Sequence, residues 1–259
     1  MDLGIKGRTA IVCASSKGLG RACAFALAEA GVDVVLNGRN ADVLKATAEA
    51  LRATYPVKVT EVVGDLSTAE GRAALLAACP NPDILINNNG GPPPKGFRQM
   101  SHDDLIAGVE ANMIAPISLM QAVLDGMVAR GFGRIINITS SSVKAPIAGL
   151  DLSSGARAGL TAFLAGPARE VARHNVTINS IMPGAFDTDR LVGAAKAQSA
   201  LRGVSVEAIR AEREATIPAA RYGRPEEFGA LAAFLASAHA GYITGQSLLI
   251  DGGAVRTAF

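Results

Sequence analysis

The chain has 259 residues, a formal net charge of +2 and an apolar fraction of 49%. Interspersed, nearly balanced charges leave no electrostatic footprint for nucleic acid or for an acidic membrane surface. The apolar content excludes a disordered chain, and the length fits one α/β domain over 1–259. The N-terminus has no apolar signal core, and glycines and polar residues break the longest uncharged stretch, 229–250. We therefore expect neither a signal peptide nor a membrane span.

Cysteines and histidines are few and scattered along the chain. Cys13, Cys23 and Cys79 lack the spacing of metal ligands, and the histidines form no cluster with one another. Isolated thiols without a disulfide framework are typical of a reducing compartment. We expect reduced cysteines, a cytoplasmic protein and no metal site.

Short β-branched runs alternate with longer helical stretches from one end of the chain to the other. Strands are expected at 9–12, 32–36, 57–63, 84–86, 134–138, 176–181 and 247–250. Helices are expected at 19–30, 41–54, 104–130, 153–174 and 225–237. Continuously apolar strands indicate a sheet that is buried on both faces. The alternation predicts an α/β fold, a doubly wound parallel sheet of about seven strands with helices on both faces.

Ligands in such folds bind beyond the carboxyl ends of the strands, so the first strand-to-helix turn is informative. It reads Cys13-Ala14-Ser15-Ser16-Lys17-Gly18-Leu19-Gly20. A glycine-rich turn that opens a helix exposes backbone N–H groups and the positive end of the helix dipole to a pyrophosphate. Close packing of the helix on the strand would also explain the glycines. Their position in the first turn favours a dinucleotide site.

The turn after the second strand indicates which dinucleotide is bound. An acidic residue there would accept a hydrogen bond from the ribose 2′-hydroxyl of NAD, and a basic residue would hold the 2′-phosphate of NADP. The turn carries Arg39 and no carboxylate, and Lys17 can approach the same phosphate from the other side. The sequence therefore predicts NADP(H), although Arg39 as a solvated turn residue is an alternative.

Five motifs in order resemble the short-chain dehydrogenase/reductase family over nearly the whole chain. They are Cys13-Ala14-x-x-x-Gly18-x-Gly20, Gly64-Asp65-Leu66, Asn87-Asn88-Asn89-Gly90, Asn179 to Pro183-Gly184 with Thr188, and Ile243-Thr244-Gly245-Gln246 to Asp251-Gly252-Gly253. The resemblance implies a single NAD(P)-binding domain with a Rossmann-type fold. It also implies a set of residues that bind the cofactor. These are Ala14, Ser16, Lys17, Gly18, Leu19, Gly20, Arg39, Asp65, Leu66, Asn88, Gly90, Pro183, Gly184 and Thr188.

The resemblance also implies a catalytic set, and here the chain departs from the family. Members use a Ser, a Tyr with a Lys four residues later, and an Asn on the preceding helix. Asn112 and Ser140 fall on the Asn and the Ser, whereas Ser153 and Arg157 fall on the Tyr and the Lys. The chain thus resembles a variant branch without the Tyr-x-x-x-Lys pair. Members of that branch are usually labelled 3-oxoacyl carrier-protein reductases.

The two changes alter the proton chemistry that is expected of the site. A serine hydroxyl is a much weaker acid than a phenol, whose pKa lies near ~10. Arg157 stays charged and cannot pass a proton, but it can favour negative charge on a carbonyl oxygen. Ser153 and Arg157 lie four residues apart on one helical face, so both should point into the cleft. Water, or Lys144 in the loop after the fifth strand, could supply the proton, although Lys144 as a solvated lysine is as good an interpretation.

The remaining expectations concern the substrate and the assembly. The charged segment 185–218 is expected to form a helical lid over cofactor and substrate. The long helices at 104–130 and 153–174 resemble the family's dimer interface and imply a homodimer or homotetramer. We expect an NADP(H)-dependent oxidoreductase acting on a small carbonyl or alcohol, with Ser153 and Arg157 in the altered site. A catalytically silent NADP-binding sensor or scaffold is the alternative, and a dehalogenase-like lyase ranks last.

Overall fold

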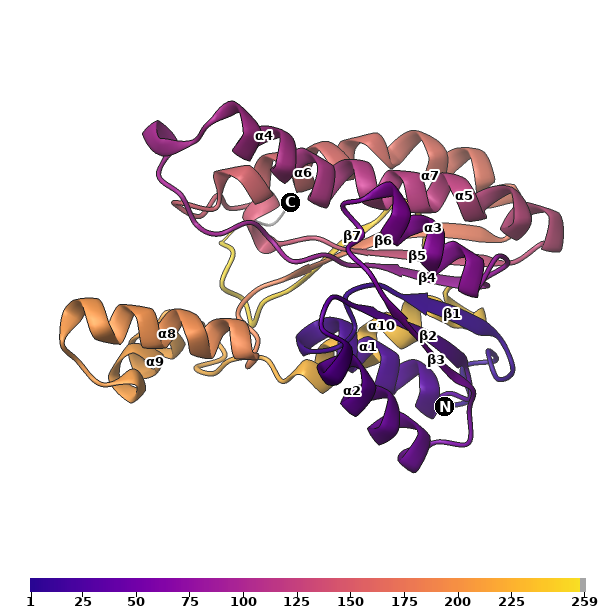
Figure 1. Ribbon diagram of the computed structural model, residues 1–259, viewed down its shortest axis with the longest axis horizontal. Helices are drawn as coiled ribbons and strands as arrows, with labels where there is room; N and C mark the ends of the chain where they lie inside the picture. The colour runs from indigo at the N-terminus through magenta and orange to yellow at the C-terminus, as the bar shows by residue number, and fades with distance from the viewer. Residues whose placement is uncertain (257–259) are drawn as a thin grey trace.

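Seven parallel strands form one sheet in the order β3-β2-β1-β4-β5-β6-β7, in the computed structural model that describes residues 1–256 (Figure 1). The strands are β1 Thr9–Val12, β2 Asp33–Gly38, β3 Val59–Val63, β4 Ile84–Asn87, β5 Gly133–Ile138, β6 Val176–Pro183 and β7 Ser247–Ile250. Their order reverses between β1 and β4, and a crevice opens at the carboxyl ends of strands at such a switch point. The predicted doubly wound α/β fold is confirmed.

Helices cover both faces of the sheet, with α1, α2 and α10 on one face and α3 to α7 on the other. The helices are α1 Gly18–Glu29, α2 Ala41–Thr54, α3 Ala69–Ala78, α4 His102–Val109, α5 Ala115–Arg130, α6 Asp151–Phe163, α7 Ala165–Val171, α8 Asp189–Arg202, α9 Val206–Ala215 and α10 Pro225–Ala236. One-turn 3₁₀ helices lie at Phe97–Gln99, Ser141–Val143, Ala172–His174 and Ala238–Ala240, and a π-helical turn lies at Glu110–Ile114. The sequence prediction missed α3.

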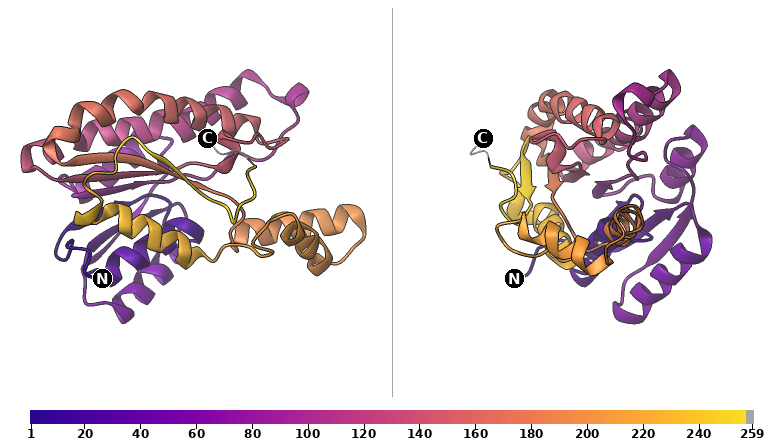
Figure 2. Two further views of the ribbon diagram at one scale, coloured as in Figure 1. Left: turned by 180° about the vertical axis from the view of Figure 1, so that it is seen from behind. Right: turned by 90° about the vertical axis from the view of Figure 1, so that its left-hand side faces the viewer.

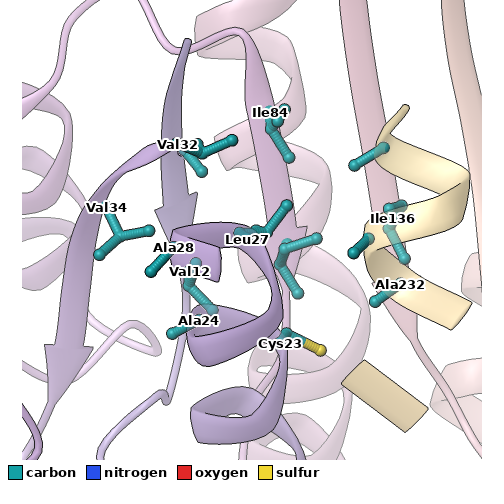
Figure 3. Packing of buried hydrophobic residues seen from close by; sticks show 14 of the residues in the cluster. Val12, Cys23, Ala24, Leu27, Ala28, Val32, Val34, Ile84, Ile136 and Ala232 are labelled. Carbon is teal, nitrogen blue, oxygen red and sulfur yellow. The ribbon is translucent and has the colours of Figure 1, made fainter. Parts of the chain in front are cut away.

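Small side chains let α1 and α10 pack closely on the sheet. Figure 3 shows Ala24 and Leu27 of α1 facing Val12 and Ile84 of the strands. A Cβ at Gly229 of α10 would lie 2.5 Å from the backbone oxygen of Ala22, so only glycine fits this crossing. The few aromatic residues of the chain are therefore compatible with a dense core built from small aliphatic side chains.

The expected helix 104–130 is divided in the structure into α4, the π-helical turn and α5. An 18-residue stretch of the continuous helical segment His102–Arg130 has a mean hydropathy of 1.3, so by length and composition alone the segment could cross a membrane. In the fold, Leu119, Val123 and Met127 of α5 are buried in the part of the core that lies between the sheet and helices α3, α5, α6 and α7. Its apolar residues therefore belong in part to the core of the sheet.

The expected helix 153–174 is likewise interrupted, because α6 ends at Phe163 and α7 begins at Ala165. Pro167 lacks the N–H that a continuous helix would use to bond the carbonyl of Phe163, which explains the break. Asn175 then adopts a left-handed conformation with φ of 57° and leads directly into β6.

The segment 185–218 contains α8 and α9, which extend away from the layered body of the molecule (Figure 2). Ala195 is the buried residue of α8, and Ile209 is the buried residue of α9. Arg210 of α9 joins this pair of helices to the residues before α8 by a 2.8 Å ion pair with Asp187, and it pairs within α9 with Glu214 at 2.8 Å. The segment is largely helical, and it packs far less tightly than the helices on the sheet.

All three cysteines are free and buried, and burial raises the pKa of the Cys13 and Cys23 thiols to about 12. Because the thiolate is the reactive species, we expect the native protein to react negligibly with a thiol reagent at pH 8. Unfolding in guanidinium should release three titratable thiols, which a colorimetric titration of native and unfolded protein would count. A rapidly reacting thiol in the folded protein would contradict this prediction.

Candidate functional site

The first strand-to-helix turn is fixed by hydrogen bonds to the end of β2. The Ser15 hydroxyl donates to the Val12 oxygen at 2.8 Å and accepts from the Asn37 backbone N–H at 3.0 Å. The Asn37 side-chain oxygen accepts from the Ala14 N–H at 3.2 Å. These bonds hold Ala14 in a left-handed conformation with φ of 44°. Ser16, the next residue of the turn, packs against Gly38.

Helix α1 begins at this turn with a free N-terminus. Lys17 precedes the helix in extended conformation without a side-chain cap, and the first turn carries no acidic residue. Gly18 has φ of +56°, and a Cβ at Gly20 would lie 2.4 Å from the Ala14 oxygen. Leu19 packs against the core. The uncapped N–H groups and close backbone approach fit a pyrophosphate.

Ala14 is the position at which a glycine should stabilise the protein. A left-handed conformation costs a residue with a Cβ about 1–2 kcal/mol relative to its preferred regions. We expect Ala14→Gly to raise the free energy of unfolding by about 1 kcal/mol. This is less than the full strain relieved, because glycine also gains conformational freedom in the unfolded chain. Urea denaturation of both proteins would measure the change, and an unchanged or lowered midpoint would contradict the prediction.

The two predicted phosphate-binding cations are each paired with a different carboxylate. Arg39 lies 3.8 Å from Asp65 and Lys17 lies 3.4 Å from Asp189, with side chains 76% and 59% exposed. Exposed pairs of this kind contribute little, so both cations can turn toward an anion. Hydrogen bonds from Ser67 lower the pKa of Asp65 against a smaller effect of burial, and the charge of Arg39 makes the smallest contribution, which also lowers it. Its neighbour Leu66 is buried.

Asparagines tie the carboxyl ends of the central strands together. Asn88 donates to the Ala14 oxygen at 3.3 Å, which joins the end of β4 to the first turn. Asn87 donates to the Asn137 side-chain oxygen at 3.0 Å, and Asn137 donates to the Asn179 backbone oxygen at 3.3 Å. This ladder crosses β4, β5 and β6, and it holds the floor of the site in one arrangement.

The residues after β4 and β6 complete the predicted cofactor set. The Gly90 N–H donates to the side chain of Asn89 at 2.8 Å, and a Cβ at Gly90 would meet open space. The Gly184 N–H, which follows Pro183 of β6, donates to the Ile250 oxygen at 2.9 Å. The Thr188 methyl lies 3.7 Å from where a Cβ on Gly18 would stand. The structure thus brings the segment after β6 against the start of α1.

Ser140 follows β5 and lies at the inner end of a chain of three serines. Its hydroxyl oxygen accepts the Ser142 backbone N–H at 3.1 Å and the Ser142 hydroxyl at 2.8 Å. The Ser142 hydroxyl in turn accepts from the Ser154 hydroxyl of α6 at 2.9 Å. Ser142 is 2% exposed, whereas Ser140 and Ser154 are half-buried. The chain therefore connects the end of β5 with the start of α6.

Ser153 and Arg157 are buried and bonded to each other, four residues apart on α6. The Arg157 Nε donates to the Ser153 oxygen at 3.0 Å, Nη2 donates to the Asn89 oxygen at 3.2 Å, and Nη1 donates to the Ile138 oxygen. Burial, and to a lesser degree the charge of Arg190, lowers the pKa of Arg157 to about 10. The guanidinium is therefore still positive at neutral pH.

Asn112 lies in the π-helical turn beside a small cavity. Its amide nitrogen donates to the Gly108 oxygen at 3.3 Å, and its buried side-chain oxygen has no partner among residues 1–256. The cavity has a volume of about 20 Å³ in which the centre of a water molecule can lie. Asn87, Asn112 and Arg157 are among its lining residues. A space of this size is large enough for one water molecule, which would satisfy the Asn112 oxygen.

The structure brings Ser140 and the Ser153–Arg157 pair together at the carboxyl ends of β4 and β5. Lys144 is exposed at the end of the 3₁₀ turn Ser141–Val143. Sequence reasoning missed Ser142 and Ser154, which contact Ser140 directly or through one hydroxyl. The run of three serines at 140–142 was the available signal. Among residues 1–256, no group of three or more His, Cys, Asp or Glu side chains could hold a metal ion.

Comparison with known proteins shows that the chain is similar to reductases. A family model described as enoyl-(acyl carrier protein) reductase matches residues 13–255. The NADPH-dependent reductase BacG of Bacillus subtilis is 34% identical over 96% of this chain and 98% of its own length. The 3-oxoacyl-[acyl-carrier-protein] reductase FabG of Aquifex aeolicus is 32% identical over 98% of this chain and 99% of its own length.

Solved structures agree with the sequence relatives. L-sorbose reductase from Gluconobacter frateurii, crystallised with NADPH and L-sorbose, superposes with a TM-score of 0.94 at 30% identity and covers 99% of this chain and 100% of its own. A structure described as a short chain dehydrogenase/reductase family protein has a TM-score of 0.83 at 29% identity over 98% of this chain and 99% of its own. This chain therefore belongs to the short-chain dehydrogenase/reductase family, and it is similar to members described as enoyl- and 3-oxoacyl-carrier-protein reductases.

Proposed function

We propose that the protein is an NADP(H)-dependent oxidoreductase that interconverts a carbonyl and an alcohol, with Ser153 and Arg157 in place of the family's Tyr and Lys. The uncapped start of α1, with a first turn free of carboxylates, carries the proposal. It lies against Thr188, on the segment that leads from the catalytic edge of the sheet into α8. NADPH-dependent relatives that cover nearly the whole chain support the same cofactor.

Residues at the carboxyl ends of five strands, β1, β2, β3, β4 and β6, would hold the dinucleotide. The backbone from Ala14 to Gly20 would surround the pyrophosphate, and Lys17 and Arg39 would contact the 2′-phosphate. The remaining cofactor residues divide between the adenine and nicotinamide sides: Asp65 and Leu66 at the adenine, and Asn88, Gly90, Pro183, Gly184 and Thr188 toward the nicotinamide. When bound, the reduced nicotinamide supplies the hydride.

Ser140 is placed to orient and polarise a substrate oxygen. Its own oxygen accepts two hydrogen bonds from Ser142, so its proton is free to be donated. The Ser153 oxygen likewise accepts a hydrogen bond, from the Arg157 Nε, so the Ser153 proton is also free to be donated. The buried charge of Arg157 favours negative charge on the reacting oxygen, because electrostatic interactions are stronger away from water. Asn112 would hold the water that completes this polar floor.

The surroundings fit a small substrate and an assembly of more than one copy. Helices α8 and α9 extend from the end of β6, next to Thr188, and would close as a lid over cofactor and substrate. Large apolar side chains are exposed on α4, the π-helical turn and α6, at Leu105, Ile106, Val109, Ile114 and Phe163. A second copy of the chain would bury these side chains, which supports a homodimer or homotetramer. A cytoplasmic location agrees with the three free thiols.

A titration with NADPH followed by a panel of ketones, 2-oxo acids and 3-oxoacyl thioesters tests the proposal. We expect NADPH to bind and to be oxidised by at least one member of the panel. Binding without oxidation, together with turnover by the double variant Ser153→Tyr, Arg157→Lys, would instead identify a silent NADP-binding sensor or scaffold. Absence of NADPH binding would favour a lyase on this fold.

A further inference from the structure

We propose that Ser142 and Ser154 form a hydroxyl relay that carries a proton from solvent to Ser140, and through it to the substrate oxygen. The inference rests on the proposed carbonyl reduction, because it concerns the proton that this reaction consumes. It assigns Ser142 and Ser154 as positioning residues that act through Ser140, the group that touches the substrate.

The three hydroxyls are ordered in one direction. Ser154 donates to Ser142 at 2.9 Å, and Ser142 donates to Ser140 at 2.8 Å. The Ser142 N–H occupies a second acceptor site on Ser140, so the Ser140 proton points away from the turn. Both O···O distances are within the range of good hydroxyl hydrogen bonds. Because a hydroxyl can both accept and donate a hydrogen bond, each serine can receive a proton on one side and pass one on the other, which is the arrangement that proton transfer requires.

Burial along the chain of serines matches a path from water to the site. The middle hydroxyl, on Ser142, is 2% exposed and bonds to the other two serines. Ser154 is half-buried, so its oxygen is the end at which a water can deliver a proton. The middle hydroxyl is shielded from water and the outer one is partly exposed, which distinguishes this chain from a cluster of serines on the surface.

Neighbouring groups do not offer the same path. Ser153 turns toward Arg157, and the guanidinium stays charged and cannot pass a proton. Consecutive helical residues point about 100° apart, which is why Ser154 reaches the turn after β5 while Ser153 does not. Lys144 is exposed and makes no hydrogen bond to residues 1–256 through its side chain.

The proton balance leaves no charged serine behind. As hydride adds to the carbonyl carbon, the carbonyl oxygen takes the Ser140 proton. Ser140 takes the Ser142 proton, Ser142 takes the Ser154 proton, and Ser154 takes one from water. Each serine loses one O–H bond and forms another, so the net reaction uses one hydride and one solvent proton. A concerted shift avoids a serine alkoxide, and the reverse shift serves alcohol oxidation.

Alanine and threonine variants at 142 and 154 test the relay with the best substrate of the panel. We expect Ser142→Ala to lower kcat about 10²-fold and Ser154→Ala about 10-fold, because a water can replace the outer hydroxyl. KM and the Kd of NADPH should change less than about 2-fold. Threonine keeps the hydroxyl, so Ser142→Thr and Ser154→Thr should recover most of the loss. Ser141→Ala, in the same turn, is the matched control, since the Ser141 hydroxyl makes no hydrogen bond to residues 1–256.

Isotope effects separate a relay from a structural role. In mixtures of H₂O and D₂O we expect a curved dependence of wild-type kcat on deuterium fraction, because several protons move together, and a straighter one for Ser142→Ala. Unchanged kcat in both alanine variants would overturn the relay and leave the reductase proposal standing. Equal losses in alanine and threonine variants, with lowered Tm, would show a structural role and also overturn it. If the wild-type protein fails to oxidise NADPH with every carbonyl of the panel, the proposed function is wrong and the relay falls with it.

Discussion

Alanine in place of Ser140 is expected to lower kcat/KM for carbonyl reduction about 10²–10³-fold, the usual loss when one hydrogen-bond donor to a developing oxyanion is removed. The hydroxyl lies at the carboxyl end of β5 with two hydrogen bonds from Ser142 to its oxygen. Its remaining interaction is therefore the one that a substrate oxygen would receive. The loss should appear in kcat as much as in kcat/KM. Removal of a hydrogen bond that strengthens in the transition state lowers both constants.

The control for Ser140→Ala is cofactor binding. Ser140 does not belong to the turns that would surround the dinucleotide, so the Kd of NADPH measured by fluorescence titration should remain within about 2-fold of wild type. Circular dichroism and Tm should also be retained, since the hydroxyl is half-buried and bonds within its own turn. A variant with wild-type kcat would show that Ser140 does not contact the reacting oxygen.

The fold could be predicted because its signal is periodic. Continuous apolar strands separated by helices specify a doubly wound sheet whatever the exact boundaries, and the strands Thr9–Val12 and Ser247–Ile250 agree to the residue. Helix α3 was missed because Ala69–Ala78 is short, rich in alanine, and buries only Gly71 and Leu75. The break at Glu110–Ile114 was also missed, since a π-helical turn has no amino-acid composition of its own.

The candidate site could be predicted only as a set of residues. Motif positions placed Ser140, Ser153 and Arg157 at one edge of the sheet, where they lie in the structure. Their partners could not be predicted, because Arg157 bonds to the backbone oxygens of Ile138 and Asn89, and a backbone carbonyl leaves no mark in the sequence. Which serine of α6 reaches Ser142 depends on helix rotation and rotamer, and neither is encoded in spacing alone.

Removal of both predicted phosphate-binding cations should change the choice between cofactors more than any other surface change. For the double variant Lys17→Ala, Arg39→Ala we expect the Kd of NADPH to rise about 10²-fold, since a hydrogen bond to a charged group contributes about 1.5–3 kcal/mol and both sites are exposed. The Kd of NADH should change less than about 2-fold, because NADH lacks the 2′-phosphate. Fluorescence titration of both cofactors would measure the ratio.

Salt and a matched surface variant complete this test. The affinity of the wild type for NADPH should fall between 0.05 and 0.5 M salt more steeply than that of the double variant, because screening weakens contacts between exposed charges. Lys45→Ala removes an exposed lysine of α2, paired with Glu49 at 3.9 Å, and should leave both affinities unchanged. Parallel losses for NADPH and NADH would contradict the assignment, since they would place Lys17 and Arg39 on the pyrophosphate that both cofactors share.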